Sequence, residues 1–399
     1  MTTKPGILLF STLNPYPFWA GSENFWFDFV KDETVNKAAK FHIALADSPV
    51  TRNRAVALTK VGATVSFYKH FNTHFTRRNL YRIADRIKRR KEKTIPWYNE
   101  IKNNKYDLVW FNAAALNDLY DLSYAMELCK KTKTPYWIIL QHGAEDFFLT
   151  SKKEIDIVTE VATRAKRFIF ISKRNRVSLE RAIGRQLDNA FHSVNAIPAS
   201  AIEQAFQLDK KNAINKGTTR KFFNLGRFSP RDKAQHLLLE AFSNAKWKDR
   251  EWQLSFIGVS DFGEIYLKKL IHFYKLDLKK IKIMSHIDNV LEEIVKHDVL
   301  LMPSLSEGTP FAMVESMACG RPALGTPVGG IPELIIEKET GWLCKTTDIK
   351  DVAEKLEEAW QQASQWKEYG HNAQKHIEKN YNQDIAFARL LEVLREDMN

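Results

Sequence analysis

Short apolar runs alternate with segments of helical periodicity along the whole chain, and this alternation constrains the fold more than any other feature of the sequence. A run of about five apolar residues between turn residues is typical of a strand that is buried on both faces. Strands that alternate with helices form parallel sheets with helices on both sides. The pattern therefore predicts an α/β protein built from doubly wound parallel sheets.

The predicted strands fall into two groups, one in each half of the chain. The first group lies at residues 6–11, 41–46, 63–68, 107–112, 136–141, 168–172 and 193–197, and the second at residues 221–226, 253–258, 281–285, 299–303, 322–325 and 341–344. A chain of 399 residues is too long for one hydrophobic core. Each group is therefore expected to form a domain of its own.

The limits of the two domains follow from composition. The stretch 199–220 is polar and rich in Asn, Lys and Thr, which makes it the best candidate for a linker. We predict an N-terminal Rossmann-like domain over residues 1–205 and a C-terminal one over residues 218–381. The apolar last helix, at about 382–399, is expected to pack back on the first domain. Ligands of open α/β sheets bind beyond the carboxyl ends of the strands, so we expect the site in a deep cleft between facing domains.

Charge and cysteine content restrict the class of protein. The chain has 60 Lys and Arg residues against 48 Asp and Glu, and the whole excess lies in residues 1–200, with 32 basic and 19 acidic residues. Cys129, Cys319 and Cys344 form no C-x-x-C pair, which argues against structural zinc and a disulfide framework and fits a reducing compartment. No apolar run approaches the roughly 18 to 20 residues that cross a bilayer. We therefore expect a cytoplasmic protein that is neither secreted nor membrane-spanning.

The most informative segment begins with the predicted strand 299–303. A loop follows, and Pro310 suits the first turn of a helix that ends at Gly320. The first turn of a helix leaves backbone N–H groups unpaired, and these groups attract anions. We predict a phosphate-binding site in this turn, around Thr309 to Ala312, and assign Gly308, Thr309, Pro310 and Phe311 to donor binding.

Two glutamates flank this turn. Glu307 lies in the loop before the helix and Glu315 about one and a half turns inside it, with seven residues between them. Carboxylates do not bind phosphate, but they accept hydrogen bonds from vicinal hydroxyl groups. A ligand with a sugar at one end, a ribose at the other and phosphates between them would satisfy both carboxylates and the helix turn.

The run from Glu307 to Pro322 resembles the signature E-G-x-P-x-x-x-x-E-A-x-A-x-G-x-P of the retaining glycosyltransferases of the GT-B fold, specifically family 4. Ser316 stands where the family usually has Ala. The resemblance extends over most of the second half of the chain and more thinly over the first. It implies a GT-B fold in which Glu307 contacts the donor sugar and Glu315 binds the ribose hydroxyls of the nucleotide.

A second match lies at the end of the predicted strand 221–226. Arg227 at a strand end and Lys233 just before a helix are suited to bind a diphosphate and to stabilise the charge of a departing group. Both resemble the phosphate-binding Arg and Lys of the family, and Gly226 is assigned to the same donor-binding turn. The family usually has Gly after this Lys, where this chain has Ala234.

Two loops of the first half complete the predicted site. Gly21 lies between the first strand and a helix, where it lets the backbone approach a ligand closely. His142 comes after the predicted strand 136–141. It resembles the His that the family places beside the reacting sugar, where it hydrogen-bonds a sugar hydroxyl or steadies the developing charge.

Several motifs of other nucleotide-binding enzymes do not occur in the sequence. It contains no Asp-x-Asp, no G-x-G-x-x-G and no Walker A motif, which disfavours metal-dependent GT-A enzymes, dehydrogenases and kinases. We expect no metal and no cofactor, because Arg227, Lys233 and the helix turn can carry the phosphate charge.

The segment from Arg77 to Lys93 holds nine Lys or Arg residues and two acidic residues, with apolar residues at helical spacing. It predicts a basic amphipathic helix that binds an anionic membrane surface, where each basic residue contributes about 1 kcal/mol. An ordinary surface helix is the alternative. Sparse aromatic residues argue against nucleic-acid binding.

Together these features predict a glycosyltransferase, specifically a hexosyltransferase, and the resemblance to family 4 implies retention at the anomeric carbon. It would move a sugar from a nucleotide-diphosphate-sugar donor to a hydroxyl of a glycan or lipid-linked acceptor in cell-surface glycan or glycolipid biosynthesis, at the inner face of the membrane. Two alternatives stay open. A sugar-nucleotide epimerase on the same fold would need no acceptor, and a catalytically silent protein would bind the nucleotide without turnover.

Overall fold

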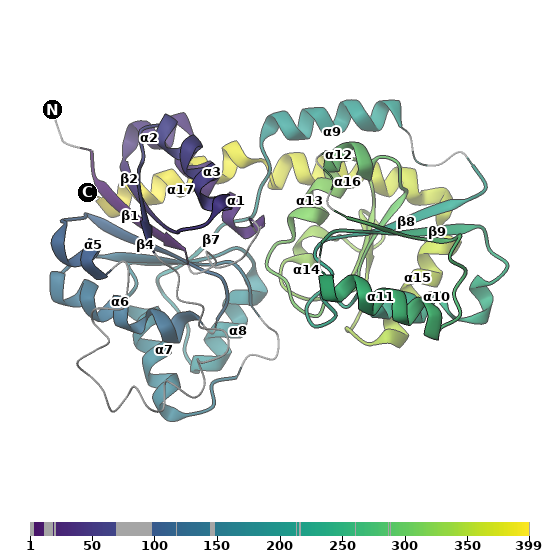
Figure 1. Cartoon of the computed structure of the whole chain (residues 1–399), viewed down its shortest axis with the longest axis horizontal. Coiled ribbons are helices and arrows are strands. Elements are labelled where there is room, and N and C mark those ends of the chain that lie inside the picture. The colour runs from purple at the N-terminus through teal and green to yellow at the C-terminus, as the bar shows by residue number, and fades with distance from the viewer. Residues whose placement is uncertain are drawn as a thin grey trace.

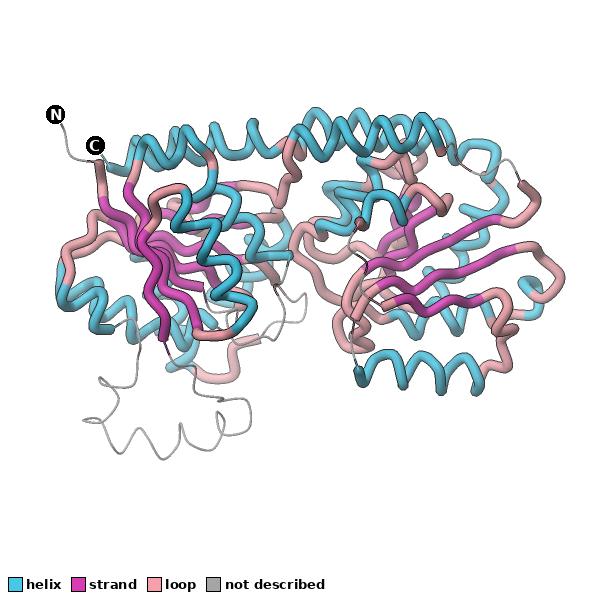
Figure 2. Tube along the Cα trace, turned by 45° about the horizontal axis from the view of Figure 1, so that its top comes forward, coloured by secondary structure: helices cyan, strands magenta, loops and turns pink. Residues whose placement is uncertain are grey.

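The computed structural model describes residues 4–11, 19, 21–68, 98–116, 118–143, 148–212, 214, 217–259, 261–285, 287 and 289–398. Within these residues the chain forms two α/β units that lie side by side (Figure 1). Each unit has a parallel sheet between helices, as the tube view shows (Figure 2). The predicted class, two doubly wound parallel sheets, is confirmed.

The first sheet has seven strands among the described residues, in the order β3-β2-β1-β4-β5-β6-β7, and all of its pairings are parallel. They are β1 (Gly6–Ser11), β2 (Lys40–Ala46), β3 (Thr64–Tyr68), β4 (Leu108–Ala113), β5 (Tyr136–Leu140), β6 (Arg167–Phe170) and β7 (Ala190–His192). All residues of β4 and β5 are buried, because helices cover both faces of the sheet. The winding reverses between β1 and β4, which makes that pair the switch point of the first sheet.

The helices of the first unit are α1 (Gly21–Lys31), α2 (Glu33–Ala38), α3 (Pro49–Lys60), α5 (Tyr98–Asn103), α6 (Asp118–Thr132), α7 (Lys152–Arg164) and α8 (Lys173–Ile183). Local sequence fixes several of their ends. Ser48 and Thr51 form a capping box at the start of α3, and Gly184 ends α8 with a left-handed backbone, φ +66°.

The second sheet has six strands among the described residues, in the order β10-β9-β8-β11-β12-β13, again with parallel pairings. They are β8 (Arg220–Leu225), β9 (Trp252–Ile257), β10 (Ile281–Met284), β11 (Val299–Met302), β12 (Ala323–Gly325) and β13 (Gly341–Leu343). Its switch point lies between β8 and β11.

The helices of the second unit and the C-terminal end are α9 (Ala199–Lys211), α10 (Gln235–Phe242), α11 (Asp261–Phe273), α12 (Val290–Ile294), α13 (Phe311–Ala318), α14 (Ile331–Leu334), α15 (Ile349–Gln361), α16 (Trp366–Asn380) and α17 (Gln383–Met398), with short 3₁₀ turns at Ala245–Trp247 and Ala363–Gln365. Helix α9 covers part of the predicted linker, and its Ile202 and Ala205 pack in the core of the second unit. The predicted limits of the domains stay predictions.

The C-terminal helices α16 and α17 run along one side of both units (yellow in Figure 1). Helix α17 packs its apolar face, which includes Leu390 and Leu394, into the same core as Ile7 and Leu9 of β1. Asp397 near its end accepts a hydrogen bond from Trp137 at 2.9 Å. The chain therefore crosses from the second unit back to the first before it ends.

One predicted strand is wrong. The sequence pattern placed the seventh strand at 193–197, whereas β7 spans Ala190–His192 and pairs with β6. Residues 193–197 are largely buried for another reason. Asn195 contacts the second unit. Ile197 forms an isolated parallel bridge with Asn382, where the two segments that connect the units lie side by side.

Among the described residues, no helix is long and apolar enough to span a membrane. The basic segment Arg77 to Lys93 lies outside the described residues, so its membrane-binding role stays a prediction.

Candidate active site

The two predicted halves of the donor site begin at the switch point of the second sheet. The loop after β8 carries Arg227 and Lys233, and the loop after β11 carries Glu307. Because β8 and β11 are paired neighbours, these loops start side by side. Ligands of open α/β sheets bind at such a point.

The Glu307 carboxylate is held by two donors. Lys233 Nζ lies 2.5 Å from Glu307 Oε1, and Ser304 Oγ donates to the same oxygen at 2.7 Å. Glu307 is 3% exposed, whereas the Lys233 side chain keeps 23% of its surface exposed. The predicted sugar-binding carboxylate and a predicted phosphate-binding cation thus form an ion pair with each other.

Arg227 projects from the start of the loop and is 41% exposed. Its guanidinium donates to Asp232 Oδ2 at 2.9 Å, and Ser229 Oγ donates to the same oxygen at 3.0 Å. The backbone oxygen of Asp232 accepts from the Leu305 N–H at 2.8 Å, which ties this loop to the loop of Glu307. Asp232 therefore orients Arg227 and joins the two loops.

The same loop is shaped by two unusual backbone conformations. Gly226 begins it with φ +147°, and Ala234 ends it with φ +47° and ψ 36°. A left-handed conformation costs a non-glycine residue roughly 1–2 kcal/mol. Ala234 adopts the conformation that glycine favours, so the loop keeps its turn although the family's glycine is replaced.

Glu315 lies inside α13 and is partly buried. Burial raises the pKa of its carboxyl group to about 7, because a buried charge loses hydration. Within the described part of the chain, no hydrogen bond or ion pair holds this carboxylate. A desolvated carboxylate without a partner is ready to accept hydrogen bonds from a ligand.

The residues before α13 form part of the contact between the two units. A Cβ added to Gly308 would lie 1.9 Å from the Gln141 backbone oxygen, so only glycine fits there. Thr309 donates its hydroxyl to the Ile171 backbone oxygen and accepts a hydrogen bond from Asn195 at its own carbonyl. Pro310 provides no side-chain cap, so no side chain of the cap residue occupies the first N–H groups of α13.

His142 lies directly beside Glu307. The next residue, Gly143, forms an antiparallel bridge with Glu307, and its carbonyl accepts from Ser306 Oγ at 3.2 Å. Burial lowers the pKa of His142, the Glu307 carboxylate opposes this shift, and the Lys233 ammonium adds to it. The imidazole is therefore neutral at pH 7 and can both donate and accept a hydrogen bond.

Gly21 is the first residue of α1 and faces the second unit. A Cβ added to it would lie 3.4 Å from the Phe311 ring. Two predicted donor-binding residues from different units are thus neighbours across the contact.

Several supporting residues were missed in the sequence. Ser304 and Asp232 carry no signal beyond their nearness to Glu307 and Lys233. Gly329 has φ +51°, and a Cβ added to it would lie 2.2 Å from the Glu307 backbone oxygen. Its backbone therefore lies close to the Glu307 carbonyl. Gly330 donates its N–H to the Gly308 carbonyl at 2.6 Å. Of these residues, only Gly329 and Gly330 carry a local sequence signal, since two consecutive glycines are typical of a turn.

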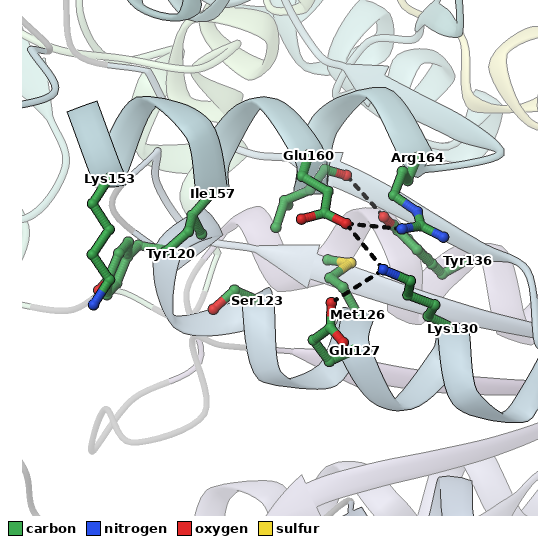
Figure 3. A pocket seen from close by; sticks show the side chains of 11 residues that line it. Tyr120, Ser123, Met126, Glu127, Lys130, Tyr136, Lys153, Ile157, Glu160 and Arg164 are labelled. Atoms are coloured by element: carbon green, nitrogen blue, oxygen red, sulfur yellow. Dashed lines mark hydrogen bonds and ion pairs between the residues drawn. The ribbon is translucent and has the colours of Figure 1, made fainter. Parts of the chain in front are cut away.

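A separate cavity lies between α6 and α7 (Figure 3), with a volume of about 180 Å³. Its charged residues pair with one another, for example Lys130 with Glu160 at 3.5 Å and Arg164 with Glu160 at 2.8 Å. A second cavity of about 670 Å³ lies beside Gly320 and His371. No predicted site residue lines either cavity.

No group of three or more His, Cys, Asp or Glu side chains in the described ranges is arranged to hold a metal ion. The expectation that the reaction needs no metal stays a prediction.

Residues 206–376 match the model of the family Glycosyl transferases group 1. This stretch, less than half of the chain, contains Arg227, Lys233, Glu307 and Glu315. The second unit therefore carries a glycosyl transferase group 1 domain.

Several curated proteins, some of them named as glycosyltransferases, match part of the chain. N-acetyl-alpha-D-glucosaminyl L-malate synthase of Bacillus anthracis is 32% identical over 116 residues, which are 28% of this chain and 30% of that protein. An uncharacterized glycosyltransferase of Methanocaldococcus jannaschii is 27% identical over 63% of this chain and 66% of its own length. The capsular polysaccharide biosynthesis glycosyltransferase CapM of Staphylococcus aureus is 24% identical over 40% and 42%. The chain thus spans between about a third and two thirds of these relatives.

A solved structure resembles the whole chain. The crystal structure of HepE from Anabaena in complex with UDP-glucose has a TM-score of 0.72 at 15% identity, over 98% of this chain and 100% of HepE. At this identity the likeness shows the fold alone, which is the GT-B fold.

Proposed function

We propose that this chain, whose residues 206–376 carry a glycosyl transferase group 1 domain, transfers a sugar from a nucleotide-diphosphate donor to an acceptor hydroxyl. One observation carries the proposal. At the switch point of the second sheet, Lys233 pairs with the buried Glu307 carboxylate of the neighbouring loop, and Arg227 projects from the same loop as Lys233. A second carboxylate, Glu315 on α13, has no partner among the described residues. This set of groups has the chemistry of a nucleotide-sugar site.

In the proposed mechanism Arg227, Lys233 and the N–H groups at the start of α13 hold the diphosphate while its bond to the sugar breaks. The leaving group gains negative charge in this step, and fixed cations stabilise that charge without reorganising. Lys233 would then exchange its contact with Glu307 for the phosphate, which frees the Glu307 carboxylate for sugar hydroxyls.

Glu307 and His142 orient the donor sugar in this proposal. A neutral His142 beside Glu307 can bond a sugar hydroxyl without adding positive charge to the reacting centre. Glu315 accepts hydrogen bonds from the ribose. We further propose retention at the anomeric carbon, as in glycosyltransferase family 4, with a phosphate oxygen of the leaving group taking the proton of the acceptor.

The proposed donor is a hexose on a nucleotide, which binds mainly to the second unit. HepE binds UDP-glucose on the same fold, which supports a UDP-hexose as the first donor to test. The acceptor is proposed to be a glycan or a lipid-linked sugar that binds to the first unit. CapM, a relative in capsular polysaccharide biosynthesis, supports a role in surface-polysaccharide assembly.

A screen of thermal melting with UDP-, GDP- and ADP-sugars identifies the donor, since a ligand that binds the native state raises the melting temperature. The stabilising donor is then incubated with the protein, and NMR analysis of the products follows the sugar. Transfer to an acceptor or to water supports the proposal, whereas conversion of the donor into an epimer without an acceptor would identify an epimerase.

The variant Glu307→Gln keeps the shape of the side chain and should reduce turnover by at least about a hundredfold. Glu392→Gln, on the exposed side of α17, is the matched control. Full activity of Glu307→Gln would remove this residue from the mechanism.

A further inference from the structure

A chain of buried hydrogen bonds runs along the carboxyl edge of the first sheet. Gln141 Nε2 donates to Asn112 Oδ1 at 2.8 Å, and Asn112 Nδ2 donates to Ser11 Oγ at 2.9 Å. Ser11 Oγ in turn donates to Glu23 Oε1 at 2.5 Å. None of the four residues is more than 3% exposed. Every donor in this hydrogen-bonded series points toward Glu23, so the series ends at the Glu23 carboxylate.

The sheet topology places this chain at the switch point of the first unit. Ser11 ends β1 and lies opposite Asn112 of β4 in the register of the two strands. Gln141 follows β5 directly, and Glu23 lies in the first turn of α1. The chain thus follows the strand ends that face a ligand in sheets of this kind.

Glu23 is a costly residue to bury here. Trp26 Nε1 donates to its second oxygen at 2.7 Å, but no cation within the described residues pairs with it. Burial raises the pKa of Glu23 to about 7. A buried carboxylate that is hydrogen-bonded but has no cation beside it lowers stability, which favours a role in the site over a role in folding.

The Gln141 end of this hydrogen-bonded series contacts the loop that carries Glu307, and the Glu23 end lies on a helix whose first residue contacts α13. At one end, the backbone oxygen of Gln141 packs on Gly308, and the two following residues are His142 and Gly143, the partner of Glu307. At the other end, α1 begins at Gly21, which lies against Phe311.

We propose that Glu23 is a positioning residue that, through Ser11 and Asn112, fixes Gln141 and thereby sets where His142 lies relative to Glu307. The proposal rests on the proposed function for its effect on turnover. Glu23 itself touches no reacting group. Its carboxylate is the final acceptor, and it sets the direction of all the hydrogen bonds in this series. A group that accepts at only one oxygen cannot hold both Ser11 and Trp26.

The first test compares three variants in the transfer reaction. Ser11→Ala removes the hydroxyl between Asn112 and Glu23 and leaves only the long direct bond from Asn112 Nδ2 to Glu23 Oε1, at 3.4 Å. Glu23→Gln leaves a single acceptor oxygen. Both should reduce kcat roughly tenfold while KM for the donor stays within about twofold, because a misplaced catalytic group affects the reacting centre more than binding. Trp26→Phe is the matched control. It removes a hydrogen bond of Glu23 outside the chain and should keep kcat within about twofold of the original protein.

The second test needs no activity. The imidazole signals of His142 are followed by NMR as pH changes. The carboxylates of Glu307 and Asp232 raise the pKa of His142, and Lys233 lowers it, so a displaced loop changes the midpoint. Ser11→Ala and Glu23→Gln should shift the midpoint by at least about 0.3 pH units, and Trp26→Phe should not.

The results separate this proposal from the proposed function. A protein that transfers no sugar but shows the midpoint shifts keeps the positioning role and refutes the transferase. Unchanged midpoints in Ser11→Ala and Glu23→Gln overturn the positioning role, and so does a loss of kcat in Trp26→Phe as large as theirs. If Glu23→Gln does not fold, Ser11→Ala, which removes one atom, decides both tests alone.

Discussion

Lys233 Nζ lies 2.5 Å from Glu307 Oε1, although 74 residues of chain separate the two side chains. The pair forms because β8 and β11 are neighbours and their loops leave the sheet at the same point. Lys233, a cation suited to bind phosphate, and Glu307, a carboxylate suited to bind sugar hydroxyls, therefore form an ion pair with each other. A donor that carries both groups would give each of them a new partner.

Replacing Lys233 with Met should lower the stability of the protein, because the buried Glu307 carboxylate loses its cation. Glu307 would stay buried with Ser304 as its remaining donor, and we expect the free energy of unfolding to fall by about 1–3 kcal/mol. In Lys233→Met/Glu307→Gln the stranded charge is gone, so the double variant should be more stable than Lys233→Met alone. Urea unfolding of the single and double variants measures this coupling. Strictly additive effects would show that the two side chains do not interact.

The buried carboxylate of Glu315 should lower the stability of the folded protein and strengthen the binding of the donor. Its pKa in the folded protein is about 7, above the value of 4.5 for a free glutamate. The folded state therefore binds the proton more tightly, and the stability that this gives is complete below pH 4.5 and lost as pH rises through 7. We expect Glu315→Gln to melt at a higher temperature than the original protein at pH 8 and at a similar temperature at pH 5.

The same variant should bind the donor nucleotide roughly tenfold more weakly in calorimetry, because it loses the charged acceptor for the ribose. Glu354→Gln, on the exposed side of α15, is the control for both measurements. A Glu315→Gln protein that is less stable at pH 8 and binds equally well would contradict this account of the residue.

Ala234 should tolerate glycine. With φ at +47°, the change to Gly relieves roughly 1–2 kcal/mol of backbone strain and costs about 0.5–1 kcal/mol of chain entropy. The variant Ala234→Gly should therefore be as stable as the original protein or up to about 1 kcal/mol more stable. Ala241→Gly, inside α10, is the control and should lose about 1 kcal/mol. Thermal melting compares the two variants. Equal losses of stability in Ala234→Gly and Ala241→Gly would rule out backbone strain at Ala234.

Arg321 should be the most sensitive residue of the second core. It is fully buried, pairs with Asp209 at 2.6 Å, and donates to the backbone oxygens of Asn212 and Val295 at 2.6 and 2.7 Å. It thus joins the ends of α9, α12 and α13.

Arg321→Met leaves those backbone oxygens without this donor and leaves Asp209 with only Gln374, at 3.2 Å. We expect a loss of about 3–5 kcal/mol in unfolding free energy. Arg52→Met breaks an exposed pair with Asp47 and should leave the free energy of unfolding almost unchanged. A similar small loss in both variants would show that Arg321 is not a structural centre.

Much of the fold was readable from the sequence because strands that are covered on both faces appear as apolar runs. β11 and β5, for example, end within a residue of their predicted limits. The pattern failed at 193–197, because contacts with the second unit bury Asn195 and Ile197 as effectively as a sheet would. Burial by a neighbouring domain leaves the same sequence signal as burial in a strand.

The candidate site was readable only in part. The spacing of Glu307 and Glu315 marked the loop and helix of the second unit. The pairing of Lys233 with Glu307 and the bridge between Gly143 and Glu307 depend on which strands are neighbours, and no local pattern encodes that. Asp232 was missed for the same reason, since its role comes from a contact with a loop more than seventy residues away.

The most direct test is a crystal structure of the protein with the nucleoside diphosphate that raises its melting temperature most. We expect phosphate oxygens within about 3 Å of the Arg227 guanidinium and the Lys233 ammonium, and ribose hydroxyls in hydrogen-bond contact with Glu315. Lys233 should have left Glu307. A nucleotide bound elsewhere, with the Lys233–Glu307 pair intact, would contradict the proposed site.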